Sequence, residues 1–231
     1  MTDYRSIFAE RNVFIAVVHT ENHEQAMRNI AIARDNGADG VFLINHSIPA
    51  SCLIDIYIAA HARFPSFWMG MNMLGQDPTA AIDGMPDNEG GLWVDDAGVQ
   101  ESGESPTADV FLAHRRERPA WKGLYFGGVA FKYQRKVRDP ALMAERAMKY
   151  VDVITTSGDG TGIPPDVEKI VAMRSRIDGY PLAIASGISP ENVAEYTEHA
   201  DCFLVATGVS DSHTELNPRR VAKLARVIAS S

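Results

Sequence analysis

The sequence predicts an eight-stranded α/β barrel, and three observations point to it. Short segments that are apolar throughout recur along the 231 residues, and a segment with helical spacing of apolar residues follows each one. Such alternation is typical of a parallel sheet whose outer face is covered by helices. Eight strand–helix units fill the chain, and no glycine fingerprint follows the first strand, so a barrel fits better than an open doubly wound sheet. We expect a single domain over residues 1–231.

The eight strands are short and mostly end in polar or small residues. We place them at residues 13–18, 40–44, 67–71, 91–94, within 123–131, and at 151–154, 182–185 and 202–206. Five of the intervening helices are predicted to begin at a polar residue followed by proline, which suits the first helical position because the N–H that it lacks would be unpaired anyway. These starts are Asp77, Ser105, Asp139, Ser189 and Asn217.

Composition and charge exclude several classes of partner. The net charge is −8 and no basic run is present, so we expect no binding to nucleic acid. No apolar run approaches the roughly 18 residues of a membrane helix, and the polar N-terminal stretch does not read as a signal peptide. We therefore expect a cytoplasmic protein without membrane insertion. Cys52 and Cys202 lie in separate apolar segments, and we expect both to be buried free thiols.

The carboxyl ends of barrel strands meet at one rim, where barrel enzymes carry their active sites. Three titratable residues at predicted strand ends are candidate catalytic groups: Lys132, His19 and Asp95. A lysine there can form a Schiff base or supply positive charge to an acidic ligand. A histidine with a pKa near neutrality can act as a general acid or base. For each, a structural role at the strand end is the alternative.

Small and glycine residues follow the last three strands, and they predict an anion site. Glycines at successive strand ends let backbone N–H groups approach a ligand, and the start of the helix after Ser189 would favour an anion at the same place. Alternatively, these glycines only allow tight turns. The predicted substrate-binding residues are Asn45, Asn72, Thr156, Ser157, Gly158, Thr161, Gly162, Ser186, Gly187, Thr207 and Gly208.

We predict no cofactor. A divalent metal held by His19, Asp95 and Asn45 is conceivable, but no HxH or HxD pair supports it, and no metal is predicted. Two tryptophans and three methionines, Trp68, Trp93, Met69, Met71 and Met73, are expected to fill the barrel or its walls. Helix faces on the barrel exterior could pair copies of the chain into a homo-oligomer, but one sequence does not locate that interface.

The chain resembles the BtpA family over most of its length. The most specific matching stretches are SGDGTGIPPD from Ser157, IASGISPENV from Ile184 and LVATGVSD from Leu204; AVVHT, NGADGVFLIN, GMNMLGQD and VAFKYQ also match. The resemblance implies a TIM barrel like the ribulose-phosphate-binding and phosphoribosylanthranilate isomerase barrels. It implies no particular reaction. The family is named for a role in photosystem I biogenesis.

Three functions remain open from the sequence. The leading hypothesis is an enzyme that acts on a phosphorylated sugar or nucleotide-derived metabolite, as an isomerase, epimerase or lyase that works by proton transfer. The second is a non-catalytic barrel that assembles or stabilises a partner complex. The third is a sensor that binds the same phosphorylated ligand without turnover. Fold alone does not decide among them.

Overall fold

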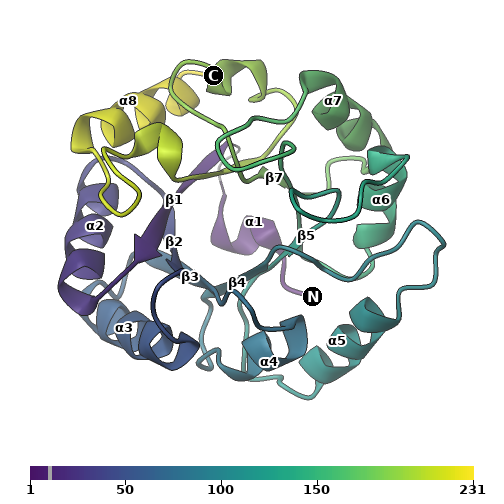
Figure 1. The fold of residues 1–231 in the computed structure, drawn as a ribbon, viewed down its shortest axis with the longest axis horizontal. Coiled ribbons are helices and arrows are strands. Elements are labelled where there is room, and N and C mark those ends of the chain that lie inside the picture. The colour runs from purple at the N-terminus through teal and green to yellow at the C-terminus, as the bar shows by residue number, and fades with distance from the viewer. Residues whose placement is uncertain (10–11) are drawn as a thin grey trace.

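Eight parallel strands form a closed barrel in the computed structural model, which describes residues 1–9 and 12–231 (Figure 1). Residues 10 and 11, part of the polar N-terminal stretch, lie outside the described residues. Each strand pairs with the next in sequence, and β1 pairs with β8, which confirms the predicted barrel. The strands are β1 (Val13–Thr20), β2 (Gly40–Asn45), β3 (Trp68–Asn72), β4 (Gly91–Val94), β5 (Tyr125–Gly128), β6 (Val153–Thr156), β7 (Leu182–Ile184) and β8 (Cys202–Val205).

Helices surround the barrel on its outer side (Figure 1). Four of the five predicted polar–proline starts begin helices, and the side chains of Asp77, Asp139 and Asn217 each accept a hydrogen bond from a backbone N–H of the first turn. The outer helices are α2 (His23–Asp35), α3 (Ala50–Arg63), α4 (Pro78–Asp83), α5 (Pro106–Arg116), α6 (Pro140–Ala147), α7 (Val167–Arg176) and α8 (Pro218–Ala229).

The prediction of an α-helix after Ser189 is wrong. Only a 3₁₀ turn, η1 (Val193–Glu195), forms between β7 and β8. The start signal is present, because the Asn192 side chain accepts a hydrogen bond from the Ser189 N–H at 2.8 Å, as in a capping box. The turns that follow close with shorter bonds, from the Glu195 N–H to the Asn192 carbonyl and from the Tyr196 N–H to the Val193 carbonyl, which is the 3₁₀ pattern. A helix dipole therefore does not contribute to an anion site at this position.

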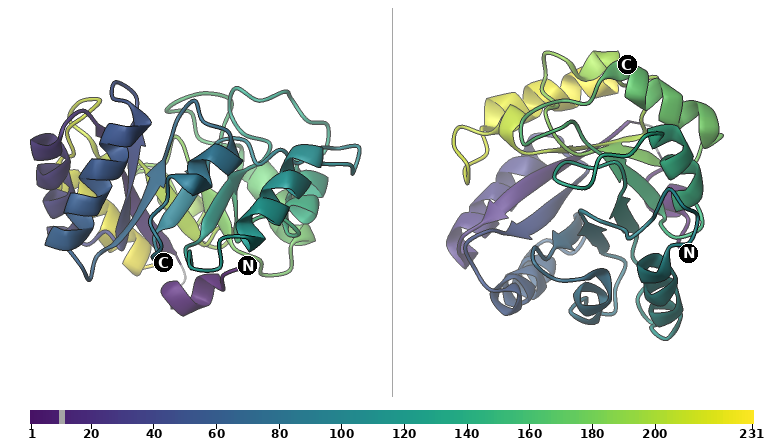
Figure 2. Two further views of the ribbon diagram at one scale, coloured as in Figure 1. Left: turned by 90° about the horizontal axis from the view of Figure 1, so that it is seen from below. Right: turned by 45° about the vertical axis from the view of Figure 1, so that its right-hand side comes forward.

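A short helix that the sequence analysis did not include, α1 (Tyr4–Ile7), closes the end of the barrel opposite the carboxyl ends of the strands (Figure 2). Tyr4 is 1% exposed and packs with Phe8 and Trp68 in the barrel interior. Arg5 forms an ion pair with Asp201 at 3.1 Å. The barrel is therefore filled from one end by the start of the chain, and its cavity opens at the other end.

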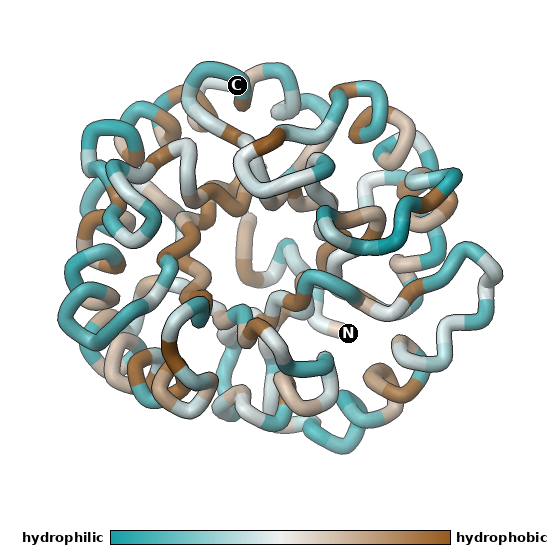
Figure 3. The backbone as a smooth tube through the Cα atoms, in the orientation of Figure 1, coloured by the Kyte–Doolittle hydropathy of each residue, from teal (hydrophilic) through white to brown (hydrophobic). Residues whose placement is uncertain are grey.

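The core has two shells, one inside the barrel and one between the strands and the helices. Hydrophobic residues follow the ring of strands, and hydrophilic residues mark the outer turns (Figure 3). As expected, Trp68 and Trp93 belong to the inner shell, whereas Met69, Met71 and Met73 belong to the outer one.

One expectation about burial is wrong. Cys52 is an exposed free thiol on α3, while Cys202 is buried as expected. Among the described residues, no helix is both long and apolar enough to span a membrane.

Candidate active site at the barrel mouth

Strand alternation decides which side chains reach the barrel interior, because successive residues of a strand point to opposite faces. Ile15 and Val17 of β1 belong to the inner shell, and His19 continues the same register at the strand's carboxyl end. Likewise His46 continues the inner register of Phe42 and Ile44. The carboxyl end of the barrel, which we call the mouth, thus receives both histidines.

A cavity of about 370 Å³ lies at the mouth. All three predicted catalytic residues line it, Lys132, His19 and Asp95, together with six of the predicted binding residues: Thr161, Gly162, Ser186, Gly187, Thr207 and Gly208. A second cavity of about 610 Å³, between the loops after β3, β4 and β5, shares Leu74 and Asp95 with the first. Titratable side chains and glycine loops that are far apart in sequence therefore line adjoining cavities at the mouth.

The glycines of the last three loops allow these loops to stack on one another. A Cβ atom on Gly187, whose φ is +68°, would lie 2.0 Å from the Pro164 nitrogen of the preceding loop. A Cβ atom on Gly208 would lie 2.0 Å from the Ile188 carbonyl oxygen. A Cβ atom on Gly158 would lie 2.3 Å from the Ile163 carbonyl oxygen of its own loop. Close packing between loops thus requires Gly187 and Gly208, and close packing within the loop after β6 requires Gly158, independently of any ligand.

Stacking leaves several backbone donors unused. Within residues 1–9 and 12–231, the N–H groups of Gly187, Ile188 and Gly208 have no hydrogen-bond partner. Gly162 differs, because its N–H donates to the Ser186 hydroxyl at 3.1 Å. Unpaired N–H groups held by rigid loops can bind an anion. The loops after β7 and β8 therefore offer donors on one side of the cavity.

The catalytic candidates lie in contrasting electrostatic surroundings. Burial is the main cause that raises the pKa of Asp95, outweighing the hydrogen bond from Asn72 at 3.1 Å and the attraction of Lys132 and His46. Burial, followed by repulsion from His213, His46 and Lys132, lowers the pKa of His19 to about 3. His19 is thus a neutral imidazole at physiological pH, and the near-neutral pKa on which its predicted acid–base role depends does not hold here.

Five predicted binding residues lie off this cavity and hold the loops instead. Asn45 points to the outer side of β2, donates to the Ile48 carbonyl at 3.1 Å and accepts from the Leu74 N–H at 2.8 Å. Asn72 lines the neighbouring cavity, and Gly158 packs within the loop after β6, against Ile163 and Pro164. Thr156 donates to the Ala130 carbonyl at 3.2 Å.

Ser157, the fifth, orders the loop that carries Lys132. Its hydroxyl accepts a hydrogen bond from the Lys132 N–H at 2.7 Å. Lys169 of α7, which sequence reasoning missed, reaches under the same loops and donates to the carbonyls of Ala130 and Ser157 at 2.7 and 2.6 Å. Burial lowers the pKa of Lys169 to about 8. Ser157 and Lys169 therefore hold the loop after β5 in the position in which Lys132 lines the cavity.

Three histidines gather at the mouth, although the sequence predicts no such cluster. His19, His46 and His213 each have a ring nitrogen that lies within 4.8 Å of a ring nitrogen of the other two. The His19 ring lies 4.6 Å from the His46 ring and 4.1 Å from the His213 ring, measured between centroids. Burial, then His213, lowers the pKa of His46 as well. Strand alternation in the sequence could have indicated His46, but no pattern indicates His213, which lies on a loop.

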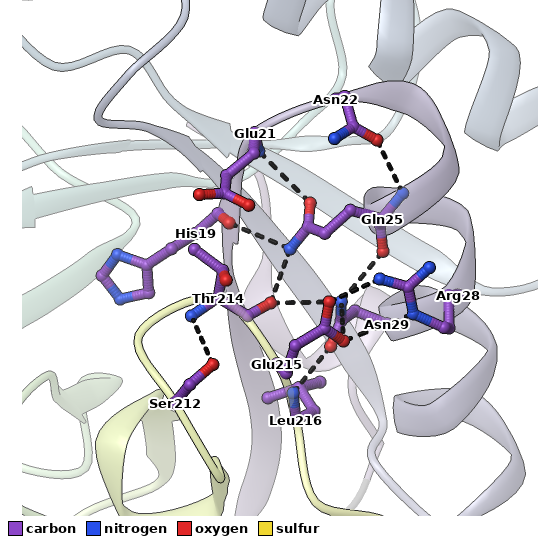
Figure 4. Close-up of polar contacts among 10 residues, drawn as sticks. All are labelled: His19, Glu21, Asn22, Gln25, Arg28, Asn29, Ser212, Thr214, Glu215 and Leu216. Atoms are coloured by element: carbon purple, nitrogen blue, oxygen red, sulfur yellow. Dashed lines mark hydrogen bonds and ion pairs between the residues drawn. The ribbon is translucent and has the colours of Figure 1, made fainter.

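The loop of His213 is tied to β1 and α2 by two buried amides (Figure 4). Gln25 donates to the His19 carbonyl at 3.1 Å and to the Thr214 carbonyl at 2.6 Å. Asn29 donates to the Thr214 carbonyl at 3.2 Å and accepts from the Leu216 N–H at 2.7 Å. The network holds the backbone next to His213 against the backbone of His19.

Comparison with known proteins supports the fold. No family model matches the chain. An uncharacterised protein of Pyrococcus horikoshii is 28% identical over 82 residues, which are 34% of this chain and 31% of that protein. An uncharacterised protein of Thermococcus kodakarensis is 34% identical over 76 residues, which are 32% of this chain and 29% of that protein. The matches thus span about a third of the relatives' length.

Solved structures extend the likeness to the whole barrel. (S)-3-O-geranylgeranylglyceryl phosphate synthase from Thermoplasma acidophilum superposes with a TM-score of 0.71 at 11% identity, covering 100% of both chains. Phosphoribosylanthranilate isomerase from Thermus thermophilus gives 0.58 at 15% identity over 94% of this chain and 98% of that one. The tryptophan synthase alpha chain from Legionella pneumophila gives 0.65 at 12%, over 98% and 94%. These likenesses show the fold, an eight-stranded parallel α/β barrel that the chain shares with all three enzymes.

Proposed function

We propose that the barrel mouth binds a phosphorylated sugar or nucleotide-derived metabolite and acts on it by proton transfer, as an isomerase, epimerase or lyase. One observation carries the proposal: a single cavity is lined by unpaired backbone donors on one side and by Lys132 and Asp95 on another. The phosphate would lie against the loops after β7 and β8. The reacting carbon atoms would then face the charged side chains.

The structural neighbours support the ligand class. The synthase from Thermoplasma acidophilum was solved in complex with its substrate sn-glycerol-1-phosphate. Phosphate groups in barrels of this type commonly lie on the loops after strands seven and eight. These are the loops that here leave N–H groups unpaired. The resemblance of the sequence to the BtpA family is compatible with this proposal, and we propose that the chain is a divergent member of that family.

Two side chains supply the chemistry. Asp95 is a half-buried carboxyl whose pKa is raised by its burial, so it holds a proton more readily than an exposed aspartate and is suited to proton transfer. Lys132 adds a positive charge to the cavity, which favours an anionic ligand or a developing negative charge. Pairing a base with a cation favours proton abstraction next to a carbonyl, because the cation stabilises the negative charge that develops on the oxygen.

Thermal unfolding in the presence of paired compounds tests the proposal. Phosphorylated sugars and nucleotides are each compared with their dephosphorylated forms. A ligand at 100 times its Kd stabilises the fold by about 2.7 kcal/mol, which is roughly 5–10 °C in Tm for a chain of this size. Only phosphorylated compounds should produce the shift.

Matched lysine variants localise the effect. Lys132→Met should reduce the shift, because it removes the positive charge at the cavity. Lys136→Met is the control, since Lys136 is 89% exposed on the same loop and pairs only with Asp159 at 3.6 Å. If no phosphorylated compound shifts the Tm of the well-folded protein, or if both variants respond like the wild type, this ligand site is wrong. The assembly function would then be the stronger hypothesis.

A further inference from the structure

We propose that His19, His46 and His213 bind one divalent transition-metal ion, such as Zn²⁺, at the barrel mouth. Each side chain offers a ligand atom within 4.8 Å of the other two. A histidine nitrogen binds Zn²⁺ at about 2.0–2.1 Å. To bind one ion, the three nitrogens must therefore come somewhat closer to one another than 4.8 Å. His46 and His213 are exposed and can turn toward the ion, while His19 is half-buried on β1.

One histidine nitrogen of the cluster has no partner in the protein. The Nδ1 atom of His19 is buried and has no hydrogen-bond partner among the described residues. A buried polar atom without a partner costs free energy unless something binds it. The three rings contact one another directly, ring to ring. A metal ion among them would give the unpaired His19 nitrogen a partner by coordination.

The polar network beneath the cluster positions two of the three ligands. Gln25 is 3% exposed and Asn29 is fully buried, and burying two amides is unfavourable unless their hydrogen bonds are used. Gln25 bonds the backbone of His19 and the residue after His213 at once. The ion pair between Arg28 and Glu215 anchors the same loop from the exposed side. Gln25 and Asn29 are therefore positioning residues that hold the His213 loop beside β1.

A three-histidine site leaves a coordination position for water or a ligand oxygen, as catalytic zinc sites do. That position would face the cavity also lined by Asp95 and Lys132. In such a place a bound metal polarises a carbonyl or hydroxyl oxygen. His19 would then be a metal ligand and not the proton carrier that the sequence predicts. The metal site is independent of the phosphate site, because different residues form it.

Direct titration tests the site in the absence of any phosphorylated compound. The full-length protein, freed of metal by chelation, is titrated with Zn²⁺ by calorimetry and with Co²⁺ by its visible absorption. We expect one ion per chain and the Co²⁺ spectrum of a four-coordinate site with nitrogen ligands. His46→Ala and His213→Ala should each weaken Zn²⁺ binding by more than about ten-fold.

His23→Ala is the matched control, because His23 is an exposed histidine at the first position of α2 and is outside the cluster. Its Zn²⁺ affinity should equal that of the wild type. Unfolding curves confirm that every variant is folded, and both cluster variants change only exposed side chains. Absence of Zn²⁺ binding by the wild type, or binding that survives both cluster variants, overturns the proposal. Either result leaves the phosphate experiment unaffected.

Discussion

Two glycines at the mouth are required for different reasons: both have a positive φ, but only one is also closely packed against another loop. Gly162 and Gly187 both have positive φ, +76° and +68°. A Cβ on Gly162 would have no atom within 4 Å, whereas one on Gly187 would overlap the Pro164 nitrogen at 2.0 Å. The sequence shows both residues only as loop glycines, so it cannot tell which one another loop approaches.

The two glycines therefore predict different losses of stability. Gly162→Ala should cost about 1–2 kcal/mol in free energy of unfolding, the cost of an L-residue in the left-handed region. Gly187→Ala should cost at least about 3 kcal/mol, because overpacking adds to that strain. Chemical denaturation of the two variants measures both values. Equal losses would contradict the stacked arrangement of the loops after β6 and β7.

Strand alternation decides which polar residues at the strand ends face the cavity and which face the surrounding loops. Asn45 and His46 are adjacent and polar, and both follow an apolar strand. Only His46 continues the inner register of Ile44, so Asn45 bonds the loops instead. His213 could not be predicted in this way, because it follows β8 by several loop residues and is positioned by Gln25 through backbone contacts.

At the scale of elements, strands and most helices could be predicted because their signals are local. Apolar runs predicted the eight strands within a few residues, and polar–proline steps predicted where four of the outer helices begin. The prediction of an α-helix after Ser189 failed because a start signal does not decide how far a helix continues: the segment starts with a capping bond and then follows the 3₁₀ pattern. Helix α1 was missed because its four residues are too few to show a helical period. Its burial depends on the barrel end that it closes, which no local pattern shows.

Helix α1 predicts a stability effect that is separate from the mouth. Tyr4→Ala removes a side chain that is 1% exposed at the closed end of the barrel, and it should lower the free energy of unfolding by about 3–5 kcal/mol. Tyr133→Ala is the control, since Tyr133 is 79% exposed. Its loss should stay within about 1 kcal/mol. Comparable losses in denaturant unfolding would mean that α1 does not fill the barrel.

At the scale of the whole molecule, the two ends of the barrel have different tasks. Aspartates immediately before β6 and β8 tie the closed end. Asp152 accepts hydrogen bonds from buried Arg115 at 2.6 Å and from the Tyr125 N–H at 2.8 Å, while Asp201 pairs with Arg5 and Arg174. At the mouth, within the described part of the chain, the Nδ1 atom of His19 and the backbone N–H groups of Gly187, Ile188 and Gly208 have no partner. Ion pairs therefore hold the closed end, and the mouth carries groups that a ligand could bind.

The central claim is that the loops after β7 and β8 bind a phosphate group, and amide NMR spectra of the ¹⁵N-labelled protein with inorganic phosphate test it most directly. The account predicts that the amide signals of Gly187, Ile188 and Gly208 move most as phosphate is added. Gly179, a glycine with φ +78° in the turn before β7 at the closed end, should not move. Unchanged signals at the three mouth residues, or equal movement of Gly179, would contradict the account.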